Sequence, residues 1–377
     1  MFMRVLITGA NGFIGRNLRQ HLAERKDVEV LAVTRDSSRE KLRAALADAD
    51  FVFHLAGVNR PENPSDFTEG NAELTSWVCD QLRAKVENGG TKAPLVLSSS
   101  TQATRDNAYG LSKREAEQAV FALGENSGVP VHVFRLPNVF GKWSRPNYNS
   151  VVATFCHNIA QGRPIQVNDP SASLSLVYVD DVVRRFLELL DGSESSFDSE
   201  GFEQIQPQYS TTVGELAQTI KTFGQSRETL TTQRVGRGLT RALHSTYLSF
   251  LRPEQFSYPI PQHGDARGVF VEMLKTPDCG QFSYFTAHPG ITRGGHYHHS
   301  KTEKFLVIKG TARFKFHHMQ TGEECELVTH GDKAEIVETV PGWTHDITNI
   351  GDTELIAMLW ANEIFDRDNP DTYACPL

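Results

Sequence analysis

The stretch VLITGANGFIG, Val5–Gly15, decides the fold of the first half of the chain. Its apolar start predicts a buried strand over Arg4–Thr8, and a helical pattern follows the glycines through Ala23. Three glycines in the spacing GxxGxxG separate the two. Such a turn needs glycine because its backbone adopts unusual dihedral angles, approaches a pyrophosphate closely and lets the helix lie against the strand. The stretch therefore predicts a dinucleotide-binding α/β domain, with a tight turn that binds nothing as the alternative.

The next predicted strand, Val28–Val33, bears on the choice of cofactor because Thr34 and Arg35 follow it. In NAD-binding domains, an acidic residue about 20 residues beyond the loop binds the ribose 2′-hydroxyl. Neither of these two residues is acidic, and the arginine suits the 2′-phosphate of NADP. We therefore expect NADPH. Asp36 keeps NADH open, and a solvated surface arginine is the alternative reading.

A tyrosine and a lysine follow a strand that ends in hydroxyl groups. The strand is predicted over Pro94–Ser100, and Tyr109 and Lys113 then open a helix that runs to about Leu123. Residues at i and i+4 share one helix face. Tyr109 can give a proton to a carbonyl oxygen while a hydride arrives from a nicotinamide, and the Lys113 cation would lower the tyrosine pKa. The pair therefore predicts a ketone reductase.

These segments, with His54-Leu55-Ala56-Gly57 at the end of a predicted strand, stand in the order typical of the extended short-chain dehydrogenase/reductase family. The chain resembles this family over about residues 1–141, although one βα unit is shortened, so the family's adenine contact is not carried over. The resemblance implies a doubly wound Rossmann-type domain in which Ser100 polarises the substrate carbonyl, with Ser99 and Thr101 as alternatives. It also implies a cofactor site formed by Gly9, Asn11, Gly12, Phe13, Ile14, Gly15, Arg35, Leu55, Ala56, Gly57, Tyr109 and Lys113.

Substrate residues are expected beyond this region. Arg135–Gly141 resembles the family's strand that leads into the substrate site, which implies that Asn138 contacts substrate. The next loop, Gly141–Ser150, is polar, aromatic and basic, so it can hold a diphosphate or uracil, or can form an interface. Its candidate ligands are Arg145, Asn147 and Tyr148. Val177–Val182 resembles a later family segment, in which Asp180 is either a helix N-cap or a substrate residue.

Short β-rich segments dominate the second half of the chain. Turns with Gly, Pro and Asp separate them, a pattern typical of an all-β barrel or sandwich. The predicted strands are Val269–Leu274, Gln281–Ala287, Glu303–Lys309, Thr311–His317, Lys333–Val337 and Glu354–Ala361. Prolines and aromatic residues before them indicate a linker. We therefore expect a reductase domain at 1–245, a linker at 246–262 and a β-barrel domain at 263–377.

The stretch GGHYHHSKTEKFLVIKG, Gly294–Gly310, concentrates metal-binding residue types. Two of its histidines alternate along a predicted strand, so both point to one face. With PGWTH, Pro341–His345, and Asn349, the stretch is similar to the two motifs of the cupin family. This resemblance implies a divalent metal held by His296, His298, Glu303 and His345, with His299, His317 and His318 outside the set. Such ligands suit Zn, Fe, Mn or Ni, of which we expect zinc; histidines that satisfy a polar core are the alternative.

A third resemblance concerns the chemistry of the barrel. DARGVFVE, Asp265–Glu272, is similar to the opening of the deoxysugar 3,5-epimerase cupins, in which an arginine before the strand binds the sugar nucleotide. Arg267 matches that arginine. Those enzymes remove a proton beside a keto group, and a metal would stabilise the enolate oxygen. They do not normally carry this metal-ligand set, and the sequence names no base.

Over nearly its whole length the chain resembles bifunctional nucleotide-sugar enzymes in which an extended reductase is fused to a metal cupin. The resemblance implies a role in UDP-N-acetyl-L-fucosamine synthesis for capsule or O-antigen polysaccharide. The cupin would epimerise C3 of UDP-2-acetamido-2,6-dideoxy-4-hexulose, and the first domain would reduce the C4 ketone to UDP-2-acetamido-2,6-dideoxy-L-talose. One alternative is a reductase whose cupin only binds sugar or dimerises. Another is an epimerase or dehydratase with tightly held NAD. A homodimer is expected because cupins often pair through strand edges.

Composition excludes other classes of function. Of the 377 residues, 39% are hydrophobic and 22% charged, as in soluble globular proteins, and the net charge of −8 argues against a nucleic-acid partner. No apolar run approaches the roughly 20 residues that span a bilayer, and the start lacks a signal pattern. The five cysteines are far apart, which indicates reduced thiols. We therefore expect a cytoplasmic enzyme without membrane insertion.

Overall fold

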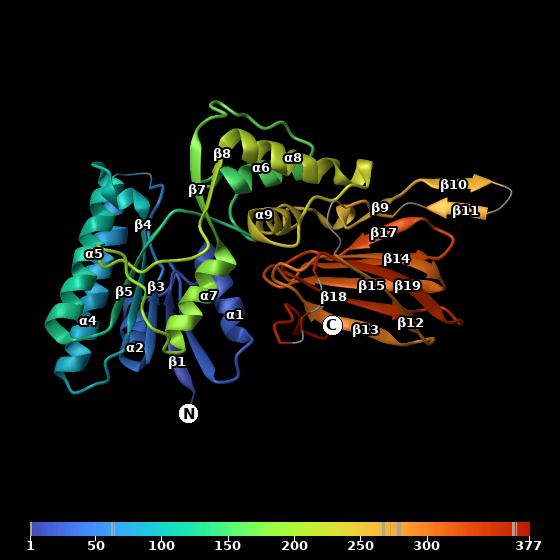
Figure 1. Cartoon of the computed structure of the whole chain (residues 1–377). Helices are drawn as coiled ribbons and strands as arrows, with labels where there is room; N and C mark the ends of the chain where they lie inside the picture. Colours follow the sequence, from blue (N-terminus) through green and yellow to red (C-terminus); the bar gives the residue numbers. More distant parts are fainter. Residues whose placement is uncertain are drawn as a thin grey trace. The chain divides into compact units, whose positions relative to one another are not determined.

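The computed structural model describes residues 2–61, 63, 65–265, 268–271, 273–276, 280–363, 366 and 368–377, with the backbone alone for 262–265, 268–271 and 281. Its contacts divide the chain into two compact units. The first comprises Met1–Val139 and Ser175–Ser210, and the second Phe140–Leu174 and Thr211–Leu377. Figure 1 shows the elements of both units. The chain passes between them within the short strands of one sheet: β6 (Asn138–Phe140), β7 (Ser173–Tyr178) and β8 (Tyr209–Thr212).

The first unit is built on a five-stranded parallel sheet with the order β2-β1-β3-β4-β5. The strands are β1 (Met3–Thr8), β2 (Val28–Val33), β3 (Phe51–His54), β4 (Leu95–Ser100) and β5 (Val131–Leu136). The order reverses between β1 and β3, and ligands of such sheets bind at the carboxyl ends of the strands on either side of that reversal. Both the glycine loop after β1 and the HLAG segment after β3 lie there.

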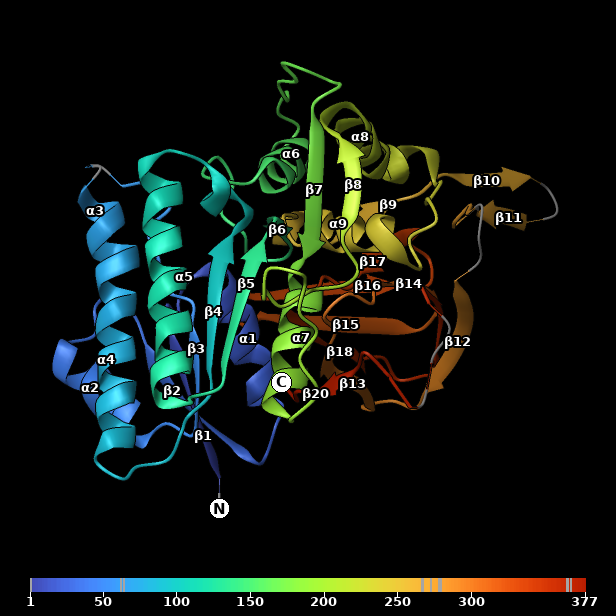
Figure 2. The ribbon, with the colours of Figure 1, turned by 60° about the vertical axis from the view of Figure 1, so that its left-hand side comes forward.

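Helices cover both faces of this sheet because its strands are apolar on both sides. The strand β1 illustrates the alternation: Leu6 packs in one core with α2 (Arg39–Asp48), α4 (Leu74–Glu87) and α5 (Ala108–Ser127). Its neighbours Val5 and Ile7 pack in the other core with α1 (Phe13–Ala23) and α7 (Val179–Leu190). Figure 2 shows α4 and α5 on one face and α1 and α7 on the other. The predicted doubly wound fold is confirmed.

The connection to α4 is irregular. A short helix, α3 (Ser65–Phe67), leads into the π-helical segment η1 (Thr68–Glu73), which continues directly as α4. A second short segment, the 3-10 turn η2 (Thr101–Thr104), joins β4 to α5. Asn107 caps α5 by accepting a hydrogen bond from the Gly110 nitrogen at 2.8 Å, and Gly128 ends it in the left-handed conformation.

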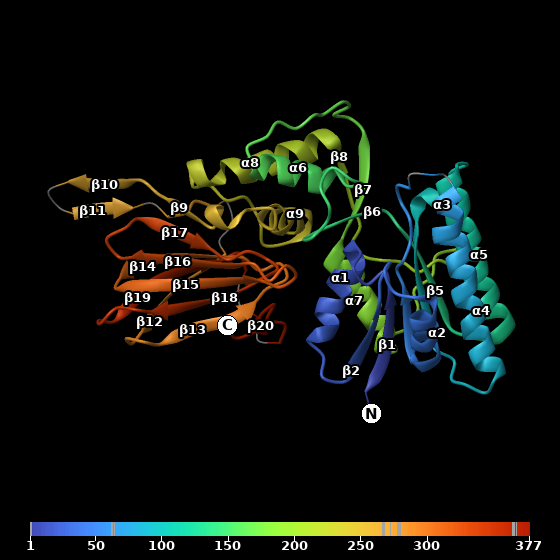
Figure 3. The ribbon, with the colours of Figure 1, turned by 180° about the vertical axis from the view of Figure 1, so that it is seen from behind.

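The second unit contains a helical layer and a barrel. The helices α6 (Val151–Ala160), α8 (Val213–Thr229) and α9 (Gly238–Leu248) pack against one another. The barrel consists of two five-stranded sheets with antiparallel pairing, in the orders β12-β19-β14-β17-β9 and β16-β15-β18-β13-β20 (Figure 3). The hairpin of β10 (Gln262–Asp265) and β11 (Gly268–Val271) stands as a separate pair.

The strands of the barrel agree with the β-rich pattern of the sequence. Their bounds are β9 (Ser257–Pro259), β12 (Gln281–Ala287), β13 (Thr292–Tyr297), β14 (Glu303–Lys309), β15 (Thr311–His318), β16 (Glu324–His330), β17 (Glu335–Glu338), β18 (Trp343–Asn349), β19 (Leu355–Ala361) and β20 (Tyr373–Ala374). Aromatic rings fill the space between the sheets: Phe305 packs edge-on against Phe314 at 5.5 Å, and Phe256 against Trp343 at 5.0 Å. The predicted all-β second half is therefore confirmed.

The segment predicted as a linker, 246–262, is structured. It holds the end of α9, the 3-10 turn η3 (Pro253–Gln255) and β9, which pairs with β17 of the barrel. The predicted boundaries at 245 and 263 stay predictions. Among the described residues, no helix has the length and apolar character that crossing a membrane requires.

Buried ion pairs attach α8 to the barrel within the second unit. Glu338 of β17 pairs with Arg227 of α8 and with Lys304 of β14, and the Lys304 ammonium donates to the Tyr258 hydroxyl at 2.8 Å. Burial favours protonation of Glu338, but Arg227 and Lys304 lower the pKa of its carboxyl to about 2. The Glu338 carboxylate is therefore ionised at neutral pH, and its negative charge compensates the two buried cations beside it.

Candidate functional site: a nucleotide-binding reductase centre and a barrel metal centre

The glycine loop brings backbone segments into close approach. Gly9 adopts φ +65°, and a Cβ there would lie 2.7 Å from the Ala56 nitrogen. A Cβ on Gly15 would lie 2.3 Å from the Gly9 oxygen, so α1 passes directly over the loop. Helix α1 starts at Gly12 without a side-chain cap, and the N–H groups of its first turn can meet a pyrophosphate. The loop thus has the shape that a dinucleotide needs.

The other residues predicted for the cofactor lie around this loop or beyond the next strand. Asn11 is exposed and accepts a hydrogen bond from Arg19 at 3.0 Å, while Phe13 and Ile14 lie half-buried in the first turn of α1. Arg35 is exposed, two residues past the end of β2. The exposed position leaves its guanidinium accessible to a ligand and does not by itself assign the ligand.

Hydrogen bonds hold both ends of the segment 55–58, which follows β3. The Ala56 nitrogen donates to the Thr8 hydroxyl at 3.2 Å, and the Asn71 side chain binds both the nitrogen and the oxygen of Val58, at 2.8 and 3.1 Å. A Cβ on Gly57 would lie 2.9 Å from Asn71 Oδ1 and 3.1 Å from Lys113 Nζ. The predicted cofactor segment, Leu55 to Gly57, is therefore held against Lys113, and only glycine fits at its closest point.

His54 lies beneath this segment and is fully buried. One ring nitrogen, Nδ1, is 2.7 Å from the Thr8 hydroxyl, and the other, Nε2, is 3.0 Å from the Thr75 hydroxyl. Thr75 in turn donates to the Asn71 carbonyl at 2.6 Å. The ring thus connects the strand before the glycine loop with the residue that holds Val58.

Ser100, Tyr109 and Lys113 meet at the carboxyl end of β4. Tyr109 is hydrogen-bonded to Ser100, and its hydroxyl donates to Asn59 Oδ1 at 3.1 Å. Lys113 Nζ is 5.9 Å from the centre of the Tyr109 ring and 3.5 Å from the Ser98 carbonyl. The sequence-predicted proton donor, hydroxyl and cation therefore lie within reach of one carbonyl group.

The structure distinguishes the three hydroxyls between which the sequence left a choice. The buried Ser99 donates to Glu117, whose carboxylate also pairs with Arg135 at 2.8 Å. Thr101 is exposed at the start of η2. Ser100 alternates with Ser99 along the strand and is the one bonded to Tyr109. Its catalytic role stays a prediction.

The ionisation of this group differs from one sequence-based expectation. Burial raises the pKa of Tyr109, with the Ser100 hydrogen bond acting in the opposite direction, so the predicted lowering by Lys113 is wrong for this structure. Burial also lowers the pKa of Lys113 to about 8, although Glu117 opposes the shift. Both effects have one cause, because the face of α5 that carries the pair is largely covered by protein.

The residues predicted to bind substrate belong to different segments of the chain. Asn138 is exposed and donates to the Ser175 carbonyl at 3.1 Å. In the following loop, Arg145 stacks on the Tyr148 ring at 4.9 Å, and Asn147 adopts φ +54°. Arg267 lies outside the described residues. Asp180 is within the first turn of α7 and contacts His21 at 3.3 Å, so the N-cap reading is wrong; the N-cap is Tyr178.

The same loop also contacts the barrel. The Trp143 indole covers Gly342, where a Cβ would lie 2.9 Å from Trp143 Nε1. Gly342 belongs to the PGWTH motif and has φ +86°. This contact lies within the chain, so the interface and the substrate readings of the loop both stay predictions.

Four side chains converge inside the barrel. His296 is the last residue but one of β13 and lies directly opposite His345 of β18, and Glu303 begins β14 in the other sheet. His298 follows β13. One ligand atom from each residue lies within 4.8 Å of all the others. The predicted set of His296, His298, Glu303 and His345 is thus brought together, without His299.

The protonation of these groups fits a cation. The Asp371 carbonyl is 2.6 Å from His298 Nδ1, so Nδ1 carries a proton and the ring turns Nε2 toward Glu303 Oε2, 3.3 Å away. His345 Nε2 is 3.5 Å from the same oxygen, and its Nδ1 has no hydrogen-bond partner among the described residues. The four side chains thus turn nitrogen and oxygen atoms toward one buried point, as the ligands of a metal ion do.

The pKa shifts agree with this reading. Burial lowers the pKa of His296 to about 3 and also lowers that of His345, so both rings are neutral near pH 7. Burial favours protonation of Glu303, but His298 and His345 hold the pKa of its carboxyl well below the ordinary value. Neutral imidazoles and a carboxylate are the donor set that zinc and other first-row metals bind.

Two residues beside this centre belong to no sequence motif, and the sequence did not predict them. The buried Lys301 places its ammonium 3.1 Å from Glu303 Oε1. Asp371, from the end of the chain, binds the backbone beside His298. Neither residue stands in a pattern that would mark it, because its partners lie across the fold.

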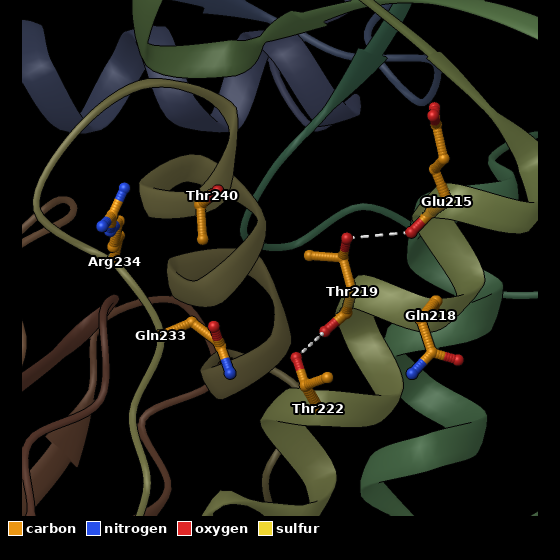
Figure 4. Close-up of a pocket in the computed structure, with 7 residues that line it drawn as sticks. All are labelled: Glu215, Gln218, Thr219, Thr222, Gln233, Arg234 and Thr240. Atoms are coloured by element: carbon orange, nitrogen blue, oxygen red, sulfur yellow. Dashed lines mark hydrogen bonds between the residues drawn. The ribbon is translucent and has the colours of Figure 1, made fainter. Parts of the chain in front are cut away.

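A separate cavity of about 660 Å³ lies between α8 and α9 (Figure 4). It is lined by Glu215, Gln218, Thr219, Thr222, Gln233, Arg234 and Thr240. The hydroxyls of Thr219 and Thr222 turn back to helix carbonyls, at 2.8 and 2.7 Å. The cavity contains none of the residues predicted from the sequence.

Comparison with known proteins supports the division into two functional parts. Residues 5–202 match the NAD dependent epimerase/dehydratase family, and residues 263–373 match the polysaccharide biosynthesis C-terminal domain. The UDP-2-acetamido-2,6-beta-L-arabino-hexul-4-ose reductase of Pseudomonas aeruginosa is 62% identical over 99% of this chain and 98% of its own.

Solved structures show the same combination. The capsular polysaccharide assembling protein CapF from Staphylococcus aureus superposes with a TM-score of 0.67 at 42% identity over the whole of both chains. A second structure of CapF, with the inhibitor 3-isopropenyl-tropolone, gives a TM-score of 0.63 at 38% identity, again over both whole chains. The chain therefore belongs to the NAD dependent epimerase/dehydratase family, in the CapF-like form that carries a polysaccharide biosynthesis C-terminal domain.

Proposed function

We propose that the chain is a bifunctional UDP-sugar enzyme on the route to UDP-N-acetyl-L-fucosamine. The barrel epimerises C3 of UDP-2-acetamido-2,6-dideoxy-4-hexulose, and the first unit then reduces the C4 ketone to UDP-2-acetamido-2,6-dideoxy-L-talose. The observation that carries the proposal is the meeting of Ser100, Tyr109 and Lys113 at the carboxyl end of the parallel sheet. The full-length relative named as a hexulose reductase supports the substrate class.

The reduction adds a hydride at C4 and a proton at O4. When bound, NADPH supplies the hydride. The Ser100 oxygen accepts a hydrogen bond from the Gln102 nitrogen at 3.1 Å, and its hydroxyl is proposed to donate to the ketone oxygen when substrate is bound. Tyr109 gives its proton to O4 as the carbonyl becomes an alcohol, and Lys113 Nζ lies 5.9 Å from the centre of its ring. Arg35 is proposed to bind the cofactor's 2′-phosphate.

The epimerisation removes the proton at C3, beside the ketone, and returns a proton to the opposite face. The three histidines and Glu303 would hold a divalent metal, for which we propose zinc, and the metal would supply a Lewis acid for the enolate oxygen. Lys301 places its ammonium beside them, 3.1 Å from Glu303. The UDP moiety is proposed to contact Asn138, Arg145, Asn147 and Tyr148, together with Arg267.

The test separates the two reactions. Tyr109→Phe removes the proton donor, so NADPH oxidation with the UDP-4-keto sugar is expected to fall at least about 100-fold. Exchange of deuterium from solvent into C3 is expected to continue at the wild-type rate. Tyr209→Phe, in β8 and outside both centres, serves as the matched control and is expected to leave both rates unchanged. Loss of exchange in Tyr109→Phe would show that one centre performs both steps.

The reciprocal variant is His296→Ala. It is expected to lose bound metal and C3 exchange while still oxidising NADPH with a substrate that already has the product configuration at C3. The exposed His330→Ala is its control. Unchanged exchange in His296→Ala would make the metal structural, which is the reading of a barrel that only binds sugar. NAD retained through purification, with no net NADPH oxidation, would instead favour an epimerase or dehydratase.

A homodimer through the barrel is proposed as well, because β12 lies at the edge of its sheet with large apolar side chains exposed. Tyr284 is 72% exposed and Phe282 is 45% exposed. Exposed apolar edge strands are natural pairing sites. Tyr284→Glu is expected to convert the dimer to a monomer in sedimentation-velocity experiments; a wild-type monomer would contradict this proposal.

A further inference from the structure

The loop that follows His298 is held by a carboxylate from the end of the chain. Asp371 accepts hydrogen bonds from the backbone nitrogens of His299 at 2.8 Å, Ser300 at 2.8 Å and Lys301 at 2.7 Å. The Ser300 hydroxyl donates to it as well, at 3.0 Å. The Asp371 side chain is 14% exposed, so these contacts are largely shielded from water. Its carboxylate therefore fixes the backbone between two of the proposed metal ligands.

The backbone of Asp371 orients a ligand directly. Its carbonyl accepts from His298 Nδ1 at 2.6 Å, and this bond leaves Nε2 of the ring to face Glu303. A neighbouring pair of strands keeps the segment in place, since β20 pairs with β13 and Ala374 lies opposite His296. Hydrogen bonds of this kind set the tautomer and ring orientation of metal-binding histidines.

Helix α9, which precedes the barrel in the sequence, reaches the same loop. Arg241 donates to the Ser300 hydroxyl and lies 3.5 Å from Asp371 Oδ2. The fully buried Ser245, one turn further along α9, donates to the Ser300 carbonyl at 2.8 Å. A third acceptor, Glu363 beyond β19, pairs with Arg241 at 2.8 Å. One guanidinium thus joins the helix to three parts of the barrel.

From these contacts we infer that Arg241 and Asp371 are positioning residues of the metal centre, and that helix α9 is a structural part of it. The inference rests on the metal site proposed above. Arg241 touches no ligand; it acts through Ser300 and Asp371, which set the path of the loop and the ring of His298. Removing it leaves the ligands present but frees the loop, so metal affinity changes while the donor set does not.

The experiment measures metal affinity on the full chain. Metal-free wild type, Arg241→Ala, Arg241→Lys and Asp371→Asn are titrated with Zn²⁺ against a competing chelator, and Co²⁺ spectra report the coordination geometry. Removing such a supporting contact typically weakens binding about 10- to 100-fold, which is expected for Arg241→Ala and Asp371→Asn. The Zn²⁺ affinity of Arg241→Lys is expected to lie between those of the wild type and Arg241→Ala, because one ammonium can replace some of the contacts of the guanidinium. The exposed Arg252→Ala is the matched control.

Folding is checked by thermal unfolding of the metal-free forms, which should melt close to wild type. Should Arg241→Ala fail to fold, Ser245→Ala removes a single hydrogen bond to the loop and is expected to give a smaller loss of affinity. Wild-type affinity and an unchanged Co²⁺ spectrum in these variants would overturn the inference and leave the metal site intact. Absence of Zn²⁺ binding in the wild type, as in His296→Ala, would overturn the metal site and the inference with it.

Discussion

At the residue scale, the hydrogen bonds of His54 determine where its proton lies. The Thr75 hydroxyl donates its proton to the Asn71 carbonyl, so its oxygen can only accept a hydrogen bond from the His54 ring. His54 Nε2 must therefore carry a hydrogen. Nδ1 is then an acceptor for the Thr8 hydroxyl, whose oxygen receives the Ala56 nitrogen. Each hydrogen bond in this series therefore has a fixed donor and acceptor. The series connects the strand before the glycine loop with the segment beside Lys113.

His54→Leu is expected to lower the free energy of unfolding by about 1–3 kcal/mol, because two buried hydroxyls lose their ring partner. Burial lowers the pKa of His54 to about 3, so the folded ring is neutral where an unfolded one would bind a proton. Wild-type stability therefore falls as the pH drops below about 6.5, by about 2 kcal/mol at pH 5 from this residue. Urea unfolding of both proteins at pH 7 and pH 5 measures the difference. His330→Leu is the control, and an equal pH dependence in His54→Leu would contradict the assignment.

Arg35 provides a second prediction at this scale, resting on the proposed use of NADPH. Arg35→Ala is expected to raise the KM for NADPH about 10- to 100-fold, the value of a hydrogen bond to a charged group, and to change the KM for NADH little. Steady-state kinetics with both cofactors measures the ratio. Arg83→Ala, an exposed arginine on α4, is the control. Equal changes for both cofactors would contradict a 2′-phosphate contact.

At the scale of the element, sequence patterns predicted what depends on neighbours along the chain. The strands β12 and β14 occur at the predicted bounds, because alternation and turn residues are local signals. The π-helical turn η1 and the short strands β9 and β20 were not foreseen, since distant segments hold them: β9 pairs with β17, and β20 with β13. The same reason explains why Asp371 escaped notice while His296 and His345 did not.

The ion pairs that attach α8 to the barrel give a prediction for this scale. Glu338→Gln leaves the buried Lys304 ammonium without its carboxylate, which is expected to cost about 3–5 kcal/mol in unfolding free energy. The wild-type carboxyl has a pKa of about 2, below its ordinary value of 4.5, so its contribution is complete above pH 4.5 and is lost as the pH falls toward 2. Glu335→Gln, whose Lys333 partner is half-exposed, should change stability little. Chemical unfolding at neutral pH measures the loss of unfolding free energy in the two variants. Equal losses would contradict the idea that burial gives the Glu338 ion pairs their larger contribution.

At the scale of the whole molecule, the two motifs of the barrel predicted the four side chains that converge there but not the residues that hold them in place. Those supports come from α9 and from the end of the chain, at positions that no motif connects to Gly294–Gly310. In the first unit the opposite holds, because the glycine loop, Tyr109 and Lys113 carry their spacing in the sequence and the doubly wound topology brings them to one edge of the sheet. Motif spacing thus predicts ligands, and tertiary structure adds their supports.

Metal removal is expected to destabilise the barrel. Zn²⁺ at about 100 times its dissociation constant adds about 2.7 kcal/mol to the unfolding free energy of a protein that binds it only when folded. Treatment with a chelator should therefore lower the melting temperature of the wild type, and added Zn²⁺ should restore it. His296→Ala should melt at the same temperature under both conditions. A wild type that melts alike with and without chelator would contradict a folded-state metal site.

The three crossings within β6, β7 and β8 constrain how the protein can be divided. The second unit takes up 140–174 and 211–377, and a piece of the first unit lies between them in the chain. No single peptide-bond cleavage therefore yields one fragment per unit, and no truncation at one position encodes either unit alone. A recombination event that exchanged only the barrel for another would also have to supply partners for Arg227 and Arg241 on the helices left behind.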